Sequence, residues 1–143
     1  MHKSKYNSVL EKFKGSHKGE SAIIFATGPS IKRYKDFHGC EKYIRIGLNR
    51  IYDHSSIVNS LDYYYYGSHF NTDAKHRENV KKICNIEGIV SLASAYENGR
   101  SHKEIGRGNV TPEQALELGS IPFENNLTDF TNDVASNDTG GWR

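Results

Sequence analysis

The sequence predicts an α/β fold in which helices flank a parallel sheet. Short apolar stretches that favour strands alternate with segments of helical spacing between residues 21 and 92. The chain has 143 residues, which is enough for one domain with a hydrophobic core. Its first predicted strand runs directly into a Gly-Pro-Ser turn, an arrangement typical of ligand-binding α/β proteins. Together these observations predict a Rossmann-like domain with three layers and right-handed crossovers.

Residues 1–20 predict an amphipathic helix followed by a polar linker. Tyr6, Val9, Leu10 and Phe13 have the spacing of one helix face, and Gly15 follows as a stop signal. Residues 1–50 carry 11 Lys and Arg against 4 Asp and Glu, whereas residues 51–143 carry 8 against 13. A solvated basic helix explains most of this asymmetry, although a basic half would also suit a phosphate-bearing ligand.

The core of the domain is predicted over residues 21–92. The uncharged segment 21–26 has the pattern of a buried strand, and a short helix is expected from Ser30 to Phe37. Further strands are expected over 43–48, 61–66 and 88–92, with a turn over 53–56 and a helix that ends at about Cys84. In the tyrosine run 63–66, alternation places two rings on each face, which favours packing against a helix over base stacking.

Residues 93–143 predict a polar, loop-rich segment. Its one clear element is a capping box formed by Thr111 and Gln114, with Pro112 at the first helical position, which predicts a helix over 112–118. Beyond Ser120, large apolar side chains are sparse and loops are expected.

Small and polar residues follow three of the predicted strands. Because parallel strands bring their carboxyl ends to one edge of a sheet, these residues are expected to share a ligand site. Gly28 would allow the backbone to approach a phosphate, and Asn49 offers donors and acceptors to a ribose or base. The candidates are Thr27, Gly28, Pro29 and Ser30 after the first strand, Asn49 after the second, and Gly67, Ser68 and His69 after the third.

The series A-T-G-P-S-I, R-I-G-L-N-R and L-D-Y-Y-Y-Y-G-S resembles the N-terminal half of bacterial CMP-sialic-acid-dependent sialyltransferases. It is also similar to the related motility-accessory glycosyltransferases and hydroxymethylpterin pyrophosphokinase-like proteins. The resemblance covers about residues 21–70. It implies a metal-independent glycosyltransferase with no cofactor, which takes a CMP-linked sugar as its donor substrate and a cell-surface glycan as its acceptor.

The resemblance also implies roles for individual residues. The turn residues Thr27, Gly28 and Ser30 would contact the nucleotide phosphate, and Asn49 would lie beside the nucleotide or the donor sugar. Gly67 or Ser68 would line the base or substrate pocket. Ala26 and Thr27 stand where the sialyltransferases have Gly and Asn, which leaves the identity of the donor sugar open.

The resemblance further implies that the chain is the N-terminal part of a longer domain. Thr139-Gly140-Gly141 looks like the start of a T/S-G-G motif that opens a later helix, so Thr139 and Gly140 join the nucleotide-binding candidates. The catalytic His of sialyltransferases lies further on, which leaves His69 as the candidate acid or base within this chain. The alternative is a catalytically inactive remnant that binds a nucleotide or serves as a scaffold.

Several other function classes lack their motifs. The chain has no Gly-rich loop ending in G-K-S/T, which excludes a P-loop nucleotidase, and no G-x-G-x-x-G after the first strand, which disfavours a dehydrogenase. The absence of D-x-D disfavours a metal-dependent nucleotide-sugar transferase, and the spacing of the histidines predicts no metal site. A net charge of +2 gives no indication of nucleic-acid binding.

Composition and segment pattern predict a cytoplasmic location. No signal peptide is expected, because no uninterrupted apolar segment follows residues 1–5, and no apolar run approaches the roughly 20 residues of a membrane span. Cys40 and Cys84 are isolated, which suits a reducing compartment. The basic first helix would allow peripheral association with the inner membrane, and exposed sheet edges in a fragment would favour a homo-oligomer.

Overall fold

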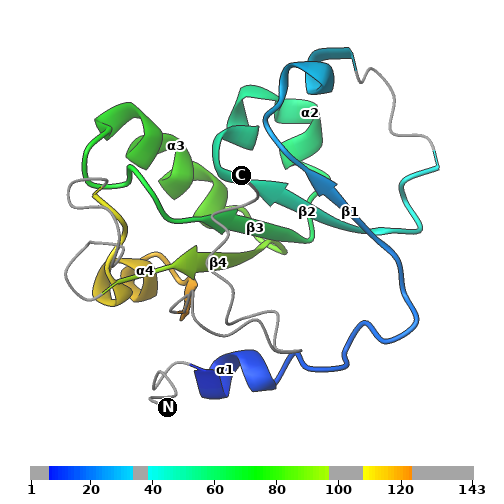
Figure 1. Ribbon diagram of the computed structural model, residues 1–143, viewed down its shortest axis with the longest axis horizontal. Coiled ribbons are helices and arrows are strands. Elements are labelled where there is room, and N and C mark those ends of the chain that lie inside the picture. The colour runs from blue at the N-terminus through cyan, green and yellow to red at the C-terminus, as the bar shows by residue number, and fades with distance from the viewer. Residues whose placement is uncertain (1–6, 34–38, 97–107, 124–143) are drawn as a thin grey trace.

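The computed structural model describes residues 7–33, 39–96 and 108–123, which form an α/β fold around a five-stranded, all-parallel sheet (Figure 1). The strands lie in sequence order, so β1 and β5 are the two edges. The predicted α/β class with a parallel sheet is therefore confirmed. The strands are β1 (Ala22–Phe25), β2 (Ile44–Leu48), β3 (Tyr63–Tyr66), β4 (Val90–Ser94) and β5 (Ile121–Phe123).

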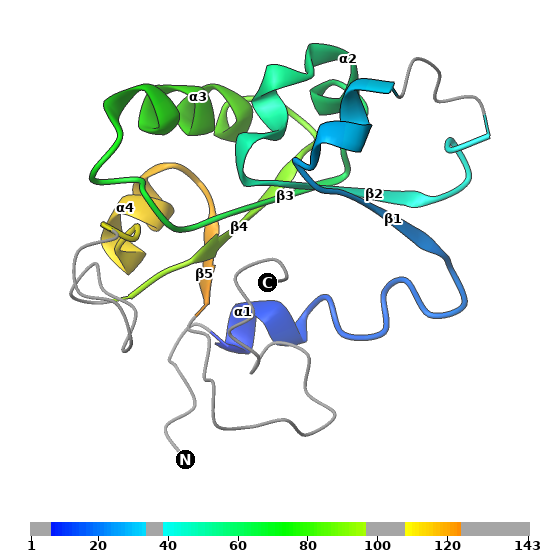
Figure 2. The same ribbon diagram turned by 45° about the horizontal axis from the view of Figure 1, so that its top comes forward.

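The helices lie on both sides of this sheet. Strands in sequence order, joined by crossovers of one hand, place their connecting helices on the same face. In Figure 2, α2 and α3 cover this face, whereas α1 lies on the opposite side of the sheet. The helices are α1 (Asn7–Glu11), α2 (Ser55–Val58), α3 (Ala74–Cys84) and α4 (Pro112–Glu117), with the 3₁₀ helices η1 (Pro29–Arg33) and η2 (Asn49–Asp53).

The hydrophobic core lies between the sheet and α3. Tyr64 and Tyr66 of β3 are fully buried there, with their rings stacked at a centroid separation of 5.7 Å. Ile83 of α3 belongs to the same buried cluster. Tyr63 and Tyr65 are half-buried on the other face, so the predicted division of the four rings between the two faces is confirmed.

The turn after α1 packs against the second face through Tyr63. The ring of Phe13 meets that of Tyr63 edge-on at 6.4 Å. His17 Nε2 lies 2.5 Å from Tyr63 Oη, and His17 Nδ1 lies 2.6 Å from Glu20 Oε2. The linker that the sequence predicts before β1 is thus held against β3 by a Glu–His–Tyr hydrogen-bond chain.

β1 is an edge strand, although its uncharged sequence predicts a buried one. Only Phe25 is buried, and Ile24 is 55% exposed. A short apolar run indicates a strand but does not indicate whether that strand is central or at the edge of the sheet, because this depends on how the strands are ordered in the sheet.

Three further elements differ from their predictions. The helix expected to Phe37 is the 3₁₀ helix η1 and ends at Arg33, while residues 34–38 lie outside the described residues. The expected turn at 53–56 is occupied by the end of η2 and by α2. The stretch after Ser120 contains β5, whose Pro122 disfavours a strand prediction but is tolerated because an edge strand leaves one row of N–H groups unpaired.

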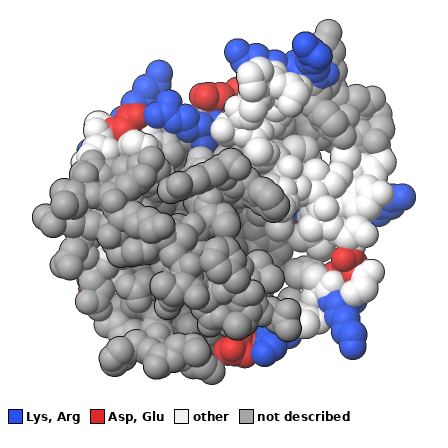
Figure 3. Space-filling model, in the orientation of Figure 1, with Lys and Arg blue, Asp and Glu red and all other residues white. Residues whose placement is uncertain are grey.

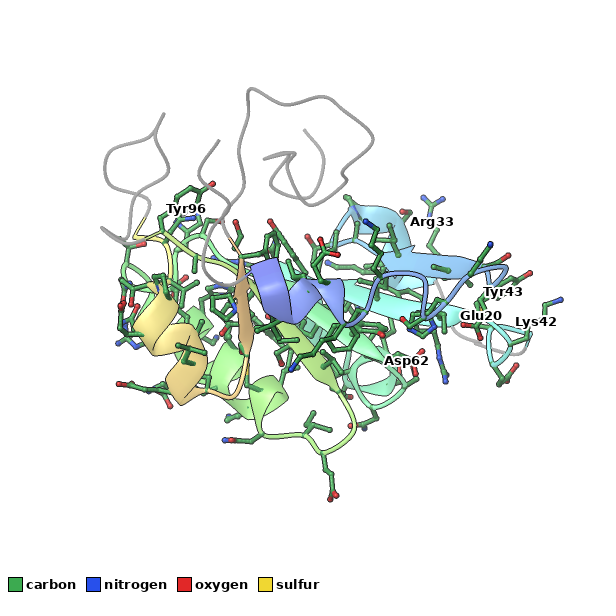
Figure 4. All side chains as sticks on the ribbon, turned by 90° about the horizontal axis from the view of Figure 1, so that it is seen from below. Glu20, Arg33, Lys42, Tyr43, Asp62 and Tyr96 are labelled. Atoms are coloured by element: carbon green, nitrogen blue, oxygen red, sulfur yellow. The ribbon has the colours of Figure 1, made fainter. Side chains whose placement is uncertain are left out.

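The sheet has a clear polarity, because all of its strands run in the same direction. Figure 4 places Glu20, Tyr43 and Asp62, which precede β1, β2 and β3, toward one end of the sheet, and Tyr96, which follows β4, at the other. The residues that the sequence singles out follow strands and therefore belong to the carboxyl edge.

Candidate functional site

The carboxyl edge brings together the residues predicted after β1, β2 and β3. Phe25 pairs with Gly47, and Leu48 pairs with Tyr65, so the three strands end at nearly the same level. The turn at Gly28, the residue Asn49 and the loop at Ser68 therefore leave the sheet from adjacent strands. Thr139 and Gly140 lie outside the described residues.

The turn after β1 is exposed and folds around Gly28. The Ile31 N–H donates to the Gly28 carbonyl at 3.1 Å, and residues from Thr27 to Ser30 are exposed. Gly28 does not have a left-handed φ, and the nearest atom to an added Cβ would be Ser30 Oγ at 4.0 Å. Neither the backbone conformation nor packing against the described residues therefore requires glycine here, which is compatible with close approach of a ligand.

Asn49 leaves β2 in the left-handed conformation, with a φ of 46°. Its carbonyl accepts a hydrogen bond of 2.6 Å from Tyr64 Oη, whose ring is fully buried in the core. A residue of the core, Tyr64, thus fixes the backbone of Asn49 through this hydrogen bond. Asparagine tolerates this conformation better than most residues, and its side-chain amide remains half-buried at the edge of the sheet.

His69 is the second non-glycine residue with a left-handed backbone among the described residues, with a φ of 63°. Its carbonyl accepts the Asp73 N–H at 3.0 Å, so it starts the turn that leads into α3, and its side chain is exposed. Left-handed conformations of residues other than glycine are costly and gather at functional sites. Here two such residues, Asn49 and His69, follow the adjacent strands β2 and β3 at the carboxyl edge of the sheet.

Gly67 has a structural reason that requires no ligand. A Cβ on this residue would lie 2.8 Å from the Ser94 carbonyl oxygen and 2.9 Å from Ser94 Cβ. Its own carbonyl accepts the Val110 N–H at 3.0 Å. Close contact with the end of β4 therefore explains this glycine, whereas the neighbouring Ser68 is half-buried beside the site.

An ion pair that the sequence does not reveal joins η2 to the N-cap of α3. Arg50 Nη2 lies 3.0 Å from Asp73 Oδ2, and Asp73 Oδ1 accepts the His76 backbone N–H at 3.0 Å. That backbone hydrogen bond lowers the pKa of the Asp73 carboxyl, and the charge of Arg50 lowers it further. Asp73 thus caps α3 and holds Arg50 at the same time.

A buried histidine lies beneath this ion pair. His76 is 3% exposed, and its Nδ1 lies 2.8 Å from Tyr52 Oη. Burial lowers the pKa of His76, and the charge of Arg50 acts in the same direction. The group is therefore neutral near pH 7. The only sequence signal for this cluster is that Arg50 and Tyr52 follow one predicted strand while Asp73 and His76 open the next long helix, but nothing in the sequence pairs the two segments.

Charge and metal-ligating groups are distributed sparsely over the described residues. On the face shown in Figure 3, Lys and Arg side chains lie in separate places around the outline and several have Asp or Glu beside them. Among the described residues visible on this face, the Lys and Arg side chains are therefore separated from one another. Within the described ranges, no three His, Cys, Asp or Glu side chains gather to hold a metal ion, and no helix has the length and apolarity that crossing a membrane requires.

The structure is that of an α/β protein with a parallel sheet, and it carries a cluster of polar residues where β2 and β3 end. Its described members are Asn49, Arg50, Tyr52, Ser68, His69, Asp73 and His76. Comparison with protein-family models, with curated proteins and with solved structures finds no match to this chain. The sialyltransferase-like assignment therefore stays a prediction.

Proposed function

We propose that the carboxyl edge of the sheet binds the nucleotide of a sugar donor. In this proposal the chain is the Rossmann-like, N-terminal donor-binding part of a cytoplasmic, metal-independent glycosyltransferase that uses a CMP-linked sugar. The observation that carries the proposal is the left-handed backbone of both Asn49 and His69 where two neighbouring strands end. Such strain is expected where side chains must be held for a ligand.

Chemistry at this edge would depend on fixed hydrogen-bond donors. The Asn49 amide offers both donors and acceptors, as recognition of a ribose or a base requires. The exposed turn at Gly28 would let backbone N–H groups approach the phosphate. Negative charge develops on that phosphate as its bond to the sugar breaks, so donors held in place there would favour the transfer.

Calorimetric titration with CMP, CDP and UDP tests the binding step. We expect CMP to bind and Gly28→Val to weaken its binding by at least about tenfold, because the branched side chain would occupy the space that the glycine leaves open. An added Cβ meets no atom of the described residues closer than 4.0 Å, so the variant should unfold at the same temperature as the parent chain. Glu87→Val, in the exposed turn after α3, is the matched control and should bind CMP normally.

A second measurement distinguishes nucleotide binding from enzymatic transfer. Incubation with CMP-sialic acid and a glycan acceptor should release CMP if the chain itself supports transfer. Binding of CMP without release would favour the alternative of a nucleotide-binding remnant. Equal CMP affinity in the parent chain and Gly28→Val, or the absence of any nucleotide binding, would contradict the proposal.

A further inference from the structure

The guanidinium of Arg50 is held at the carboxyl edge with most of its donors unused. Arg50 directly follows Asn49, and its side chain is 57% exposed. Asp73 Oδ2 lies 3.0 Å from Nη2, and no second partner of this guanidinium occurs in the part of the chain that the structure describes. Arginine carries five N–H donors, so most of them face solvent or a ligand.

Asp73 holds this guanidinium in place because it is itself anchored twice. Its Oδ1 accepts the His76 backbone N–H at 3.0 Å, and its backbone N–H donates to the His69 carbonyl at 3.0 Å. The carboxylate therefore belongs to the first turn of the eleven-residue helix α3, which packs on the core. A charged group fixed on a rigid element loses little conformational freedom when it binds a ligand.

The same contacts bring His69 close to Arg50. Asp73 is hydrogen-bonded to the backbone of His69 and paired with Arg50, and the buried His76 responds electrostatically to both. The exposed His69 ring and the half-buried Asn49 amide add further hydrogen-bonding groups at the same strand ends. The Asp73 carboxylate uses one N–H of the Arg50 guanidinium, so the remaining donors of Arg50 are available to a second anion.

A purely structural role explains less of this arrangement. An exposed ion pair between a surface arginine and a surface aspartate contributes little to stability. Asp73 also caps α3 without any help from Arg50. The left-handed backbone of His69 lowers stability rather than raising it. By contrast, a planar guanidinium matches two phosphate oxygens at once, which an ammonium group does not.

We propose that Arg50, positioned by Asp73 and flanked by His69, binds the phosphate group of the ligand at the carboxyl edge. The ligand class is a phosphate ester or diphosphate with at least two free oxygens on one phosphorus atom. This site deepens the proposed function, on which it rests for the identity of the nucleotide, because it names the side chain that holds the donor's phosphate.

Calorimetric titration with inorganic pyrophosphate and, separately, with CMP tests the site. We expect the parent chain to bind both, Arg50→Gln to lose at least tenfold in affinity for both, and Arg50→Lys to retain part of it, because lysine keeps the charge but not the fork. Lys82→Gln, which removes the same charge from the last turn of α3, should leave both affinities unchanged. Unfolding temperature and far-ultraviolet circular dichroism of each variant report whether the fold is retained.

The outcomes distinguish this site from the proposed function. If Arg50→Gln and Arg50→Lys bind pyrophosphate and CMP as the parent chain does, the assignment of Arg50 is wrong while nucleotide binding stands. If pyrophosphate binds through Arg50 but CMP binds no more tightly than pyrophosphate, the phosphate site stands and the nucleotide function is wrong. If the parent chain binds neither compound, both proposals are wrong.

Discussion

Tyr52 Oη and His76 Nδ1 lie 2.8 Å apart and join η2 to α3 beneath the carboxyl edge of the sheet. The two residues are 24 positions apart in sequence. Their bond fixes the ring of a buried histidine that feels the charges of both Arg50 and Asp73. Stability, pH response and ligand binding at this edge are therefore expected to be connected.

Stability should depend on pH through His76. Burial lowers the pKa of this group from 6.5 in the folded state, so unfolding takes up a proton between the two values. Its contribution to stability is complete above the unfolded pKa of about 6.5 and is lost as the pH falls through the lower folded pKa. We expect the unfolding temperature of His76→Gln to fall less between pH 7.5 and 5.5 than that of the parent chain.

Tyr52→Phe is the matched control for this effect, because it removes the hydrogen bond but keeps the histidine. Its unfolding temperature should be lower at every pH, with a dependence on pH like that of the parent chain. Parallel curves for the parent chain and His76→Gln would show that His76 does not titrate with a lowered pKa.

Alanine and glycine at position 69 should differ in stability. The φ of 63° suits glycine and costs an alanine about 1 kcal/mol or more. His69→Gly is therefore expected to be more stable than His69→Ala by about 1 kcal/mol in urea unfolding, after the greater freedom of glycine in the unfolded chain is allowed for. A more stable alanine variant would contradict the left-handed backbone. Asn49→Gly and Asn49→Ala give the same comparison at the end of β2.

Gly67 and Gly28 should respond in opposite ways to alanine. A Cβ at position 67 would lie 2.8 Å from a carbonyl oxygen of β4, which cannot move without disturbing the sheet. Gly67→Ala is expected to cost about 1–3 kcal/mol, as overpacking does in cores. Gly28→Ala meets open space and should change stability by no more than about 0.5 kcal/mol. Similar unfolding midpoints for the two variants would contradict the close contact between Gly67 and Ser94.

The capping box of α4 should contribute to stability. Thr111 Oγ1 accepts the Gln114 N–H at 3.3 Å, and Gln114 Oε1 accepts the Thr111 N–H at 3.0 Å. The Gln114 amide also exchanges two hydrogen bonds with the Asn71 side chain, at 2.8 and 2.9 Å, which ties α4 to the loop before α3. Thr111→Ala is expected to cost about 1 kcal/mol in thermal or urea unfolding, whereas Thr111→Ser keeps the cap and should cost much less.

Local patterns predicted most of the regular elements. The strands at β2, β3 and β4, the end of the helix α3, and the capping box at Thr111 all lie within a few residues of the expected positions. Each of these signals depends on neighbours three or four positions away or on alternation along a strand. Such contacts are formed by the chain segment itself, so they are visible in its sequence.

The candidate site was predicted only in part, because several of its contacts join segments that are distant in the sequence. Asn49 and His69 follow apolar strands, so their place at the carboxyl edge could be expected. Their left-handed backbones could not be predicted, since neither is a glycine. The Arg50–Asp73 pair spans 23 positions between two elements that meet only after the sheet has formed. Gly67 suggested a ligand contact, but its packing against Ser94 gives a reason internal to the fold.

Local sequence patterns are sufficient to predict the α/β class, the approximate positions of the main strands and of α3, and the edge at which polar residues gather, because periodicity and strand direction are local properties. Three features become visible only in the folded chain: β1 lies at one edge of the sheet, β5 forms the other edge, and Arg50, Asp73 and His76 form one cluster. These features depend on which distant segments pack together, and that choice is made by the whole core rather than by any single stretch of chain.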